Sequence, residues 1–141
     1  MGRRLKTRGC NVPFLASIAT TSTTDIYFQA ERTGTVDAVF FSSLAALAAS
    51  DTNYITFTVT NLGQAGAGTT EMLLATDVNT TKATGGSALV ANANRSLGMG
   101  TVANRACVEG DTIRIRATAT GTLAGAVTVP RCTVLISANG L

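Results

Sequence analysis

Two segments in which apolar and polar side chains strictly alternate restrict most strongly what this chain can fold into. In residues 53–61, an isoleucine, a phenylalanine and a valine alternate with threonines. In residues 112–120, isoleucines and alanines alternate with arginines and threonines. Alternation of period two places one set of side chains on a buried face of a strand and the other set on an exposed face. Both segments are therefore predicted to be half-buried β-strands.

Six further segments have a β-type composition and are separated by glycine- or threonine-rich connectors. They are residues 12–19, 26–31, 36–41, 71–76, 88–93 and 127–137. Short strands with turn signals at about 10–15-residue spacing are typical of antiparallel sandwiches and barrels. We therefore expect an all-β fold, an antiparallel β-sandwich of about eight strands. Pro130 favours an edge position or a bulge in the last of them.

One segment has a helix-forming composition instead. Residues 42–50 read Ser-Ser-Leu-Ala-Ala-Leu-Ala-Ala-Ser. Alanine and leucine favour helices, and Ser42 or Ser43 is a suitable N-cap. We expect a short helical turn near residues 43–50, within a connection between sheets.

The positive charge of the chain is concentrated at its start. The first eight residues hold four basic side chains, namely Arg3, Arg4, Lys6 and Arg8. Residues 9–141 hold seven basic and eight acidic side chains. We therefore expect an extended basic N-terminal arm over residues 1–11 and a single β-sandwich domain over residues 12–141. Such an arm is either a solvated tail or a segment that orders against an acidic partner surface.

We do not expect the arm to bind nucleic acid, because the rest of the chain shows no basic patch and few aromatic residues for stacking. No run of 18 apolar residues exists, so we expect no membrane-spanning helix. The weakly apolar stretch after the arm is short and contains Pro13, which makes a poor signal peptide. We expect the chain to be made and kept in a reducing compartment, since its three cysteines include no close pair.

The composition excludes several kinds of chemistry. The chain has no histidine, so Ser-His-Asp triads and histidine-ligated zinc are impossible. The acidic residues show no calcium-loop spacing, and residues 63–68 lack the features of a phosphate-binding loop. Cys132 alternates with Val134 and Ile136 and is predicted to be a core residue. We expect no catalytic, cofactor-binding or metal-binding residues and no enzymatic activity.

The stretch Val108-Glu-Gly-Asp-Thr-Ile-Arg-Ile-Arg-Ala-Thr-Ala-Thr-Gly-Thr122, together with short Thr/Ala/Gly-rich strands, resembles the head-decoration (cement) proteins of tailed bacteriophages. The resemblance covers roughly 100 residues and concerns their general composition and strand pattern, with a loose V-x-x-G-D-x-[IL] motif. It implies a jelly-roll-like domain, commonly a homotrimer, that is made in the host cytoplasm. It also implies a place on the exterior of the virion, where the domain binds the major capsid protein and stabilises the head.

The expected contact residues are the basic arm and the aromatic side chains that a sandwich leaves exposed. They are Tyr27, Tyr54 and one residue of the Phe40–Phe41 pair, for which Phe41 is our candidate. Two alternatives remain open at this point. One is a coat or shell protein whose arm faces packaged nucleic acid, and the other is a receptor- or carbohydrate-binding sandwich of a phage particle.

Overall fold

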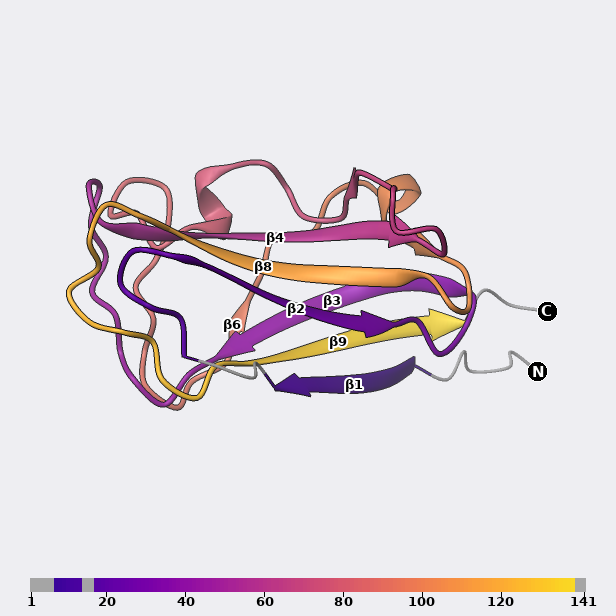
Figure 1. Cartoon of the computed structure of the whole chain (residues 1–141), viewed down its shortest axis with the longest axis horizontal. Coiled ribbons are helices and arrows are strands. Elements are labelled where there is room, and N and C mark those ends of the chain that lie inside the picture. Colours follow the sequence, from indigo (N-terminus) through magenta and orange to yellow (C-terminus); the bar gives the residue numbers. More distant parts are fainter. Residues whose placement is uncertain (1–6, 14–16, 139–141) are drawn as a thin grey trace, which may run out of the picture.

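The structure, a computed structural model, describes residues 7–13 and 17–138, with side chains from residue 17 onward (Figure 1). The described part contains nine strands and two short 3₁₀ helices. The strands are β1 (Thr7–Pro13), β2 (Thr23–Gln29), β3 (Gly34–Ser42), β4 (Tyr54–Gly63), β5 (Thr70–Glu71), β6 (Arg95–Ser96), β7 (Ala106–Cys107), β8 (Thr112–Thr120) and β9 (Arg131–Ala138). The 3₁₀ helices are η1 (Asp77–Asn79) and η2 (Val102–Arg105).

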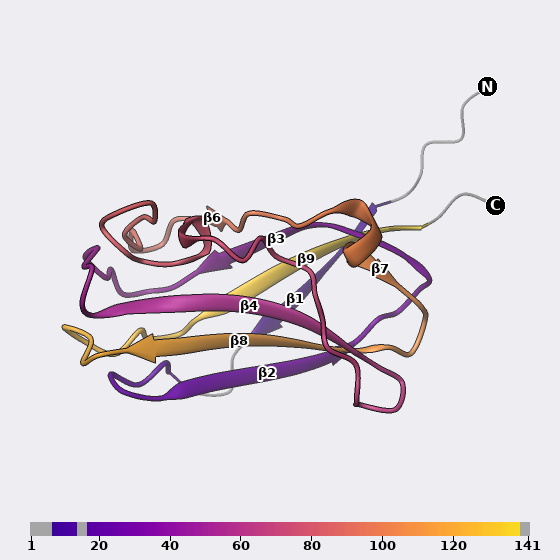
Figure 2. The ribbon, with the colours of Figure 1, turned by 90° about the horizontal axis from the view of Figure 1, so that it is seen from above.

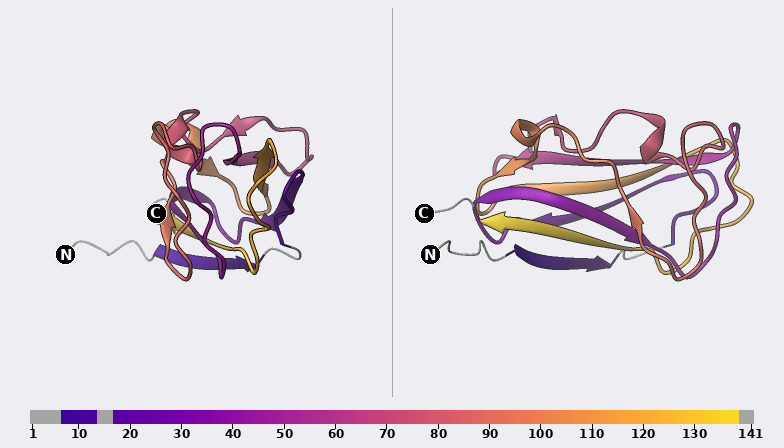
Figure 3. Two further views of the ribbon diagram at one scale, coloured as in Figure 1. Left: turned by 90° about the vertical axis from the view of Figure 1, so that its left-hand side faces the viewer. Right: turned by 180° about the vertical axis from the view of Figure 1, so that it is seen from behind.

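The strands form two antiparallel sheets that pack face to face (Figures 1 and 3). One sheet has the order β1-β9-β3-β6, with β7 also paired to β3, and the other has the order β2-β8-β4-β5. From each strand to the next one in the sequence, the chain crosses to the other sheet, except from β4 to β5 and from β6 to β7. This strand order is that of a jelly roll, a double-sheet form of the β-sandwich. The predicted all-β, jelly-roll-like sandwich is confirmed.

The two alternating segments form the centre of one sheet. Residues 112–120 are β8 as predicted, and residues 53–61 correspond to β4. Their apolar side chains face the other sheet and are buried, whereas most of the alternating polar side chains face outward. The rings of Phe57 and Phe41 meet at the centre of the core with centroids 4.6 Å apart.

The prediction that Phe41 is a contact residue is wrong. Phe41 is 0% exposed, while its neighbour Phe40 is half-buried on the outer side of β3. The cause is a β-bulge at Asp37, where the register of β3 against β9 shifts between Val36 and Ala38. The extra residue moves the following odd-numbered side chains to the inner face, so that Phe41 faces the core.

The helical turn expected near residues 43–50 is absent from the structure, which shows extended and irregular backbone there. The backbone of this segment bonds to other parts of the chain instead. Leu47 and Leu89 exchange two main-chain bonds of 3.0 and 2.9 Å, and the N–H of Ser50 donates to the carbonyl of Thr81 at 3.1 Å. So short a stretch forms a helix only weakly in isolation, and these tertiary bonds outweigh its local preference.

Several strand boundaries differ from the prediction. β1 occupies residues 7–13, whereas the sequence favoured 12–19, of which 14–16 lie outside the described residues. β1 pairs with β9 along its whole length, so residues 7–11 of the expected arm form part of a sheet. β9 begins at Arg131, directly after Pro130.

The predicted strands at 71–76 and 88–93 are much reduced. Of the first, Glu71 lies in β5 and Leu73 forms a single bridge with Met99, and the second contributes a single bridge between Leu89 and Leu47. The sequence did not predict the two-residue strands β6 and β7. The segment between β5 and β7 therefore lies over one side of the sandwich mostly as irregular chain, around β6 in Figure 2.

Candidate functional site

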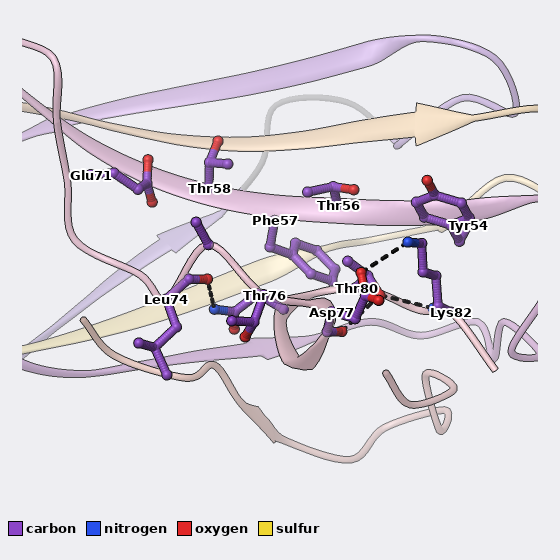
Figure 4. Close-up of a pocket in the computed structure, with 12 residues that line it drawn as sticks. Tyr54, Thr56, Phe57, Thr58, Glu71, Leu74, Thr76, Asp77, Thr80 and Lys82 are labelled. Carbon is purple, nitrogen blue, oxygen red and sulfur yellow. Dashed lines mark hydrogen bonds and ion pairs between the residues drawn. The ribbon is translucent and has the colours of Figure 1, made fainter. Parts of the chain in front are cut away.

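A cleft of about 300 Å³ lies along the outer edge of β4 (Figure 4). Its floor is formed by β4, from which Tyr54, Thr56 and Thr58 point outward. The facing wall is the segment that follows β5 and contains η1. The wall and the ends of the cleft are lined by Glu71, Leu74, Ala75, Thr76, Asp77, Asn79, Thr80 and Lys82.

The cleft exists because the segment is bonded to β4 at two points and arches away between them. At one end, the N–H of Met72 donates to the carbonyl of Val59 at 2.7 Å. At the other end, the N–H of Thr81 donates to the carbonyl of Ile55 at 2.9 Å. The intervening residues turn through η1, which leaves a hollow beside the middle of β4.

Asn79 holds this arch in place from inside. Its side chain is 1% exposed, and its Nδ2 donates to the carbonyls of Leu74 and Gly98, each at 2.8 Å. Its Oδ1 accepts from the N–H of Gly98 at 2.7 Å. Asn79 also begins an Asn-Thr-Thr glycosylation sequon, but a side chain buried and bonded in this way cannot carry a glycan in the folded protein.

Glu71 closes one end of the cleft. Its Oε1 accepts from the N–H groups of Val59 at 2.7 Å and Leu73 at 3.2 Å, and its Oε2 accepts from the hydroxyl of Thr60 at 3.1 Å. The carboxylate therefore takes the place of a main-chain acceptor at the end of the short β5 pairing. These bonds favour a structural role for Glu71 over a catalytic one.

Lys82 and Tyr54 form the other end of the cleft. The Nζ of Lys82 lies 2.9 Å from the Oδ1 of Asp77 and 4.9 Å from the centre of the Tyr54 ring. The hydrogen bond from Lys82 to Asp77 holds the pKa of the lysine above its usual value. Tyr54, one of the predicted contact residues, is half-buried here, and Lys82 covers part of its ring.

Arg95 of β6 also binds the segment that contains η1 and forms the wall of the cleft. Its Nη1 donates to the carbonyl of Ser87 at 2.7 Å, and its Nη2 donates to the carbonyls of Val78 and Thr80. Its guanidinium carbon lies 5.7 Å from the centre of the Phe57 ring. Burial lowers the pKa of this guanidinium below its usual value. Sequence reasoning missed Arg95, and nothing in the sequence marks it, because its acceptors are backbone carbonyls.

The outer face of the sheet β2-β8-β4 forms a second polar surface, next to the cleft. Tyr27 of β2 is 55% exposed on it and lies opposite Arg114 of β8 in the strand register. Two residue pairs along the register, on the same face, Arg116 donates two bonds of 2.7 Å to the carboxylate of Asp25, through Nε and Nη2. These bonds lower the pKa of Asp25 and raise that of Arg116.

Arg114 is the positive charge of this surface that has no carboxylate within ion-pair distance in residues 17–138. Its Nη2 donates to the hydroxyl of Thr60 at 3.3 Å. Its Nε is buried and has no hydrogen-bond acceptor among the described atoms. We name Tyr27, Arg114, Arg116 and Asp25 together the Tyr27 face.

The Gly110-Asp111 pair in the segment that carries the family resemblance forms a turn. The Oδ2 of Asp111 accepts from the N–H of Val108 and from the Nδ2 of Asn61, both at 2.9 Å. Gly110 has φ +88°, a conformation that side chains with a Cβ rarely adopt. Gly-Asp thus fixes the tight turn from β7 into β8.

Both cysteines whose side chains the structure describes, Cys107 and Cys132, are free and buried. Burial raises the pKa of the Cys132 thiol to about 12, and it also raises the pKa of Cys107. The prediction that Cys132 is a core residue is confirmed.

The predicted contact residues do not form one cluster. Tyr27 lies on the Tyr27 face, Tyr54 lines the cleft, and Phe41 lies in the core. The main chain of Arg8 lies in β1, and the other three basic residues of the arm lie outside the described residues.

No group of His, Cys, Asp or Glu in the described residues is arranged to hold a metal ion. The same residues contain no helix that is long and apolar enough to cross a membrane. Comparisons of the chain with models of protein families, with curated proteins and with solved structures return no match.

Proposed function

We propose that the protein is a structural component of a phage particle that binds the outer capsid surface and stabilises the head. The observation that carries this proposal is the jelly-roll strand order, β1-β9-β3-β6 against β2-β8-β4-β5. Jelly rolls recur in viral capsid and lectin domains. The sequence resemblance to decoration proteins supports the same role.

The surface that supports binding to another protein is the Tyr27 face. Tyrosine and arginine are enriched in protein–protein interfaces, because each combines a large contact area with directed polar groups. Tyr27 is exposed there, and Arg114 has no carboxylate within ion-pair distance in residues 17–138. The partner in this proposal is the major capsid protein, which presents a carboxylate to Arg114. The resemblance also implies that copies of the chain associate with one another.

Co-sedimentation with purified phage heads that lack this protein tests the proposed surface. Tyr27→Ala and Arg114→Gln are each expected to weaken binding by about tenfold, as for central residues of an interface. Arg131→Gln is the matched control, because Arg131 is exposed and belongs to the other sheet. Unchanged binding of both Tyr27-face variants, with a wild-type fold by circular dichroism, would contradict the proposed surface.

The basic arm needs a separate test by substitution. The structure places residues 7–13 in β1, so a deletion that reaches residue 9 would also damage a strand. Replacing Arg3, Arg4 and Lys6 by glutamine is expected to weaken capsid binding and to reduce its dependence on salt. If these substitutions leave capsid binding intact but abolish salt-dependent retention on a nucleic-acid column, a coat protein is the better description.

A further inference from the structure

One side of the sandwich is formed by a strand whose outer edge is unpaired in the described part of the chain. Among the described residues, β2 pairs with β8 alone and is the last strand of its sheet. In Figure 2, β2 lies along one edge of the molecule, and the segment around β6 lies at the opposite edge. An unpaired edge presents a row of N–H and C=O groups to which another strand can bond.

Two main-chain hydrogen bonds establish which residues of β2 point to the free edge. The N–H of Ala119 donates to the carbonyl of Ser22, and the N–H of Ala30 donates to the carbonyl of Asp111. Main-chain groups along an antiparallel strand point alternately to its two sides. The even-numbered residues between these two bonds therefore bond to β8. The odd-numbered residues, which are Thr23, Asp25, Tyr27 and Gln29, direct their N–H and C=O groups outward.

This edge lacks the usual features that prevent edge-to-edge pairing. Strand edges are commonly protected by proline, lysine, a bulge or a very short strand. β2 has seven residues, Thr-Thr-Asp-Ile-Tyr-Phe-Gln, and pairs with β8 in an uninterrupted register. Its one charged side chain, Asp25, is already neutralised by Arg116.

We propose that β2 binds β2 of a second copy of this chain, antiparallel and about a two-fold axis at Ile26. In this register Asp25 faces Tyr27 of the other copy, and Thr23 faces Gln29. All four outward-pointing residues of each strand are then bonded, with two main-chain bonds at each pair. The contact joins the two sheets β2-β8-β4-β5 into one continuous sheet.

Charge and packing select this register over its neighbours. A shift that places the axis at Asp25 brings two carboxylates directly opposite each other, which is unfavourable. A shift that places the axis at Tyr27 leaves Thr23 without a partner within the strand. With the axis at Ile26, the Ile26 side chains of the two copies face each other on the buried side of the joined sheet. Phe28, which packs against the core of its own copy, lies on the same side. The contact is isologous and closes on two copies, where the family resemblance implies three.

Hydrogen exchange of the purified wild-type protein tests the pairing amide by amide. At high protein concentration the amides of Asp25 and Tyr27 are expected to exchange about tenfold more slowly than at low concentration. The amides of Thr24 and Ile26, which bond to β8, serve as internal controls and are expected to be protected at both concentrations. Light scattering at the high concentration is expected to give twice the chain mass of 14.4 kDa.

Tyr27→Pro tests the same contact, because it removes an outward N–H and leaves the bonds to β8 in place. It is expected to raise the dissociation constant at least about tenfold. Tyr27→Thr is the matched control, because it keeps the N–H and a residue that favours strands, and it is expected to dimerise.

The inference would be overturned if light scattering gave the mass of one chain and the amides of Asp25 and Tyr27 exchanged at the same rates at all protein concentrations. An oligomer that forms without protection of these two amides would overturn it as well. Neither result depends on capsids, so the proposed function is tested separately by co-sedimentation.

Discussion

Asn79 is the buried side chain that connects the arched segment of the cleft to the neighbouring chain. It makes three hydrogen bonds, to Leu74 and Gly98, and is 1% exposed. Asn79→Ala is expected to lower the free energy of unfolding by about 2–4 kcal/mol, because it leaves buried main-chain groups without partners. Urea unfolding measures this loss. Asn94→Ala, at an exposed asparagine, is the control and is expected to stay within about 0.5 kcal/mol of wild type.

The ion pair between Asp25 and Arg116 makes stability depend on pH. The bonds from Arg116 hold the pKa of Asp25 below its usual value in the folded state. The stabilisation is therefore present above the unfolded-state pKa of about 3.9 and is lost as the pH falls through the folded-state pKa. Asp25→Asn is expected to cost about 1–2 kcal/mol at pH 7, and the difference from wild type is expected to shrink as the pH falls below 4.

Urea unfolding at a series of pH values measures this difference. Glu31→Gln, a substitution at an exposed position away from the ion pair, is the control and is expected to have little effect at pH 7. A stability difference between Asp25→Asn and wild type that is constant down to pH 2 would contradict the assigned role of the ion pair.

At the scale of elements, Arg95 fastens the segment from η1 to residue 87 onto the sandwich. Its guanidinium donates to carbonyls of Val78, Thr80 and Ser87. Arg95→Lys is expected to destabilise the protein by about 1–3 kcal/mol, because a single ammonium cannot reach all three acceptors in the same geometry. The segment is then expected to open more often, so trypsin should cleave after Lys82 faster than in wild type. Arg131→Gln, which alters an exposed arginine elsewhere, should leave the rate of this cleavage unchanged.

The sequence predicts those elements whose own side chains decide their structure. β4 and β8 follow from alternation because each has one buried and one exposed face over its full length. β5, β6 and β7 have two residues each and depend on partners distant in sequence, so they leave no local pattern. The extended backbone around Leu47 has the same cause, because its bonds to Leu89 override a helix-forming composition.

The candidate site was predictable only in part, for a related reason. Tyr27 was identified because an aromatic residue on the polar face of a strand is exposed. Phe41 was assigned wrongly because a single bulged residue reverses the faces of the rest of β3. The cleft depends on Asn79, Glu71 and Arg95 bonding to backbone groups, and such acceptors cannot be recognised in a sequence.

At the scale of the whole molecule, the two sides of the sandwich differ. The side next to β4 is covered by the arched segment that Asn79 and Arg95 hold, whereas the edge of β2 is unpaired in the described chain. Adjoining that edge is the Tyr27 face, with an exposed tyrosine and an arginine that has no ion-pair partner in the described residues. These surfaces are the ones through which we propose that the protein binds a capsid and a second copy of itself.

The most direct test of the capsid role is to add the wild-type protein to purified phage heads that lack it. Bound protein is measured by sedimentation, and head strength is measured by the temperature at which packaged DNA is released. We predict saturable binding at a fixed number of copies per head and a higher release temperature. Protein that stays in the supernatant at all concentrations, or that binds without any change in the release temperature, would contradict a stabilising role on the capsid.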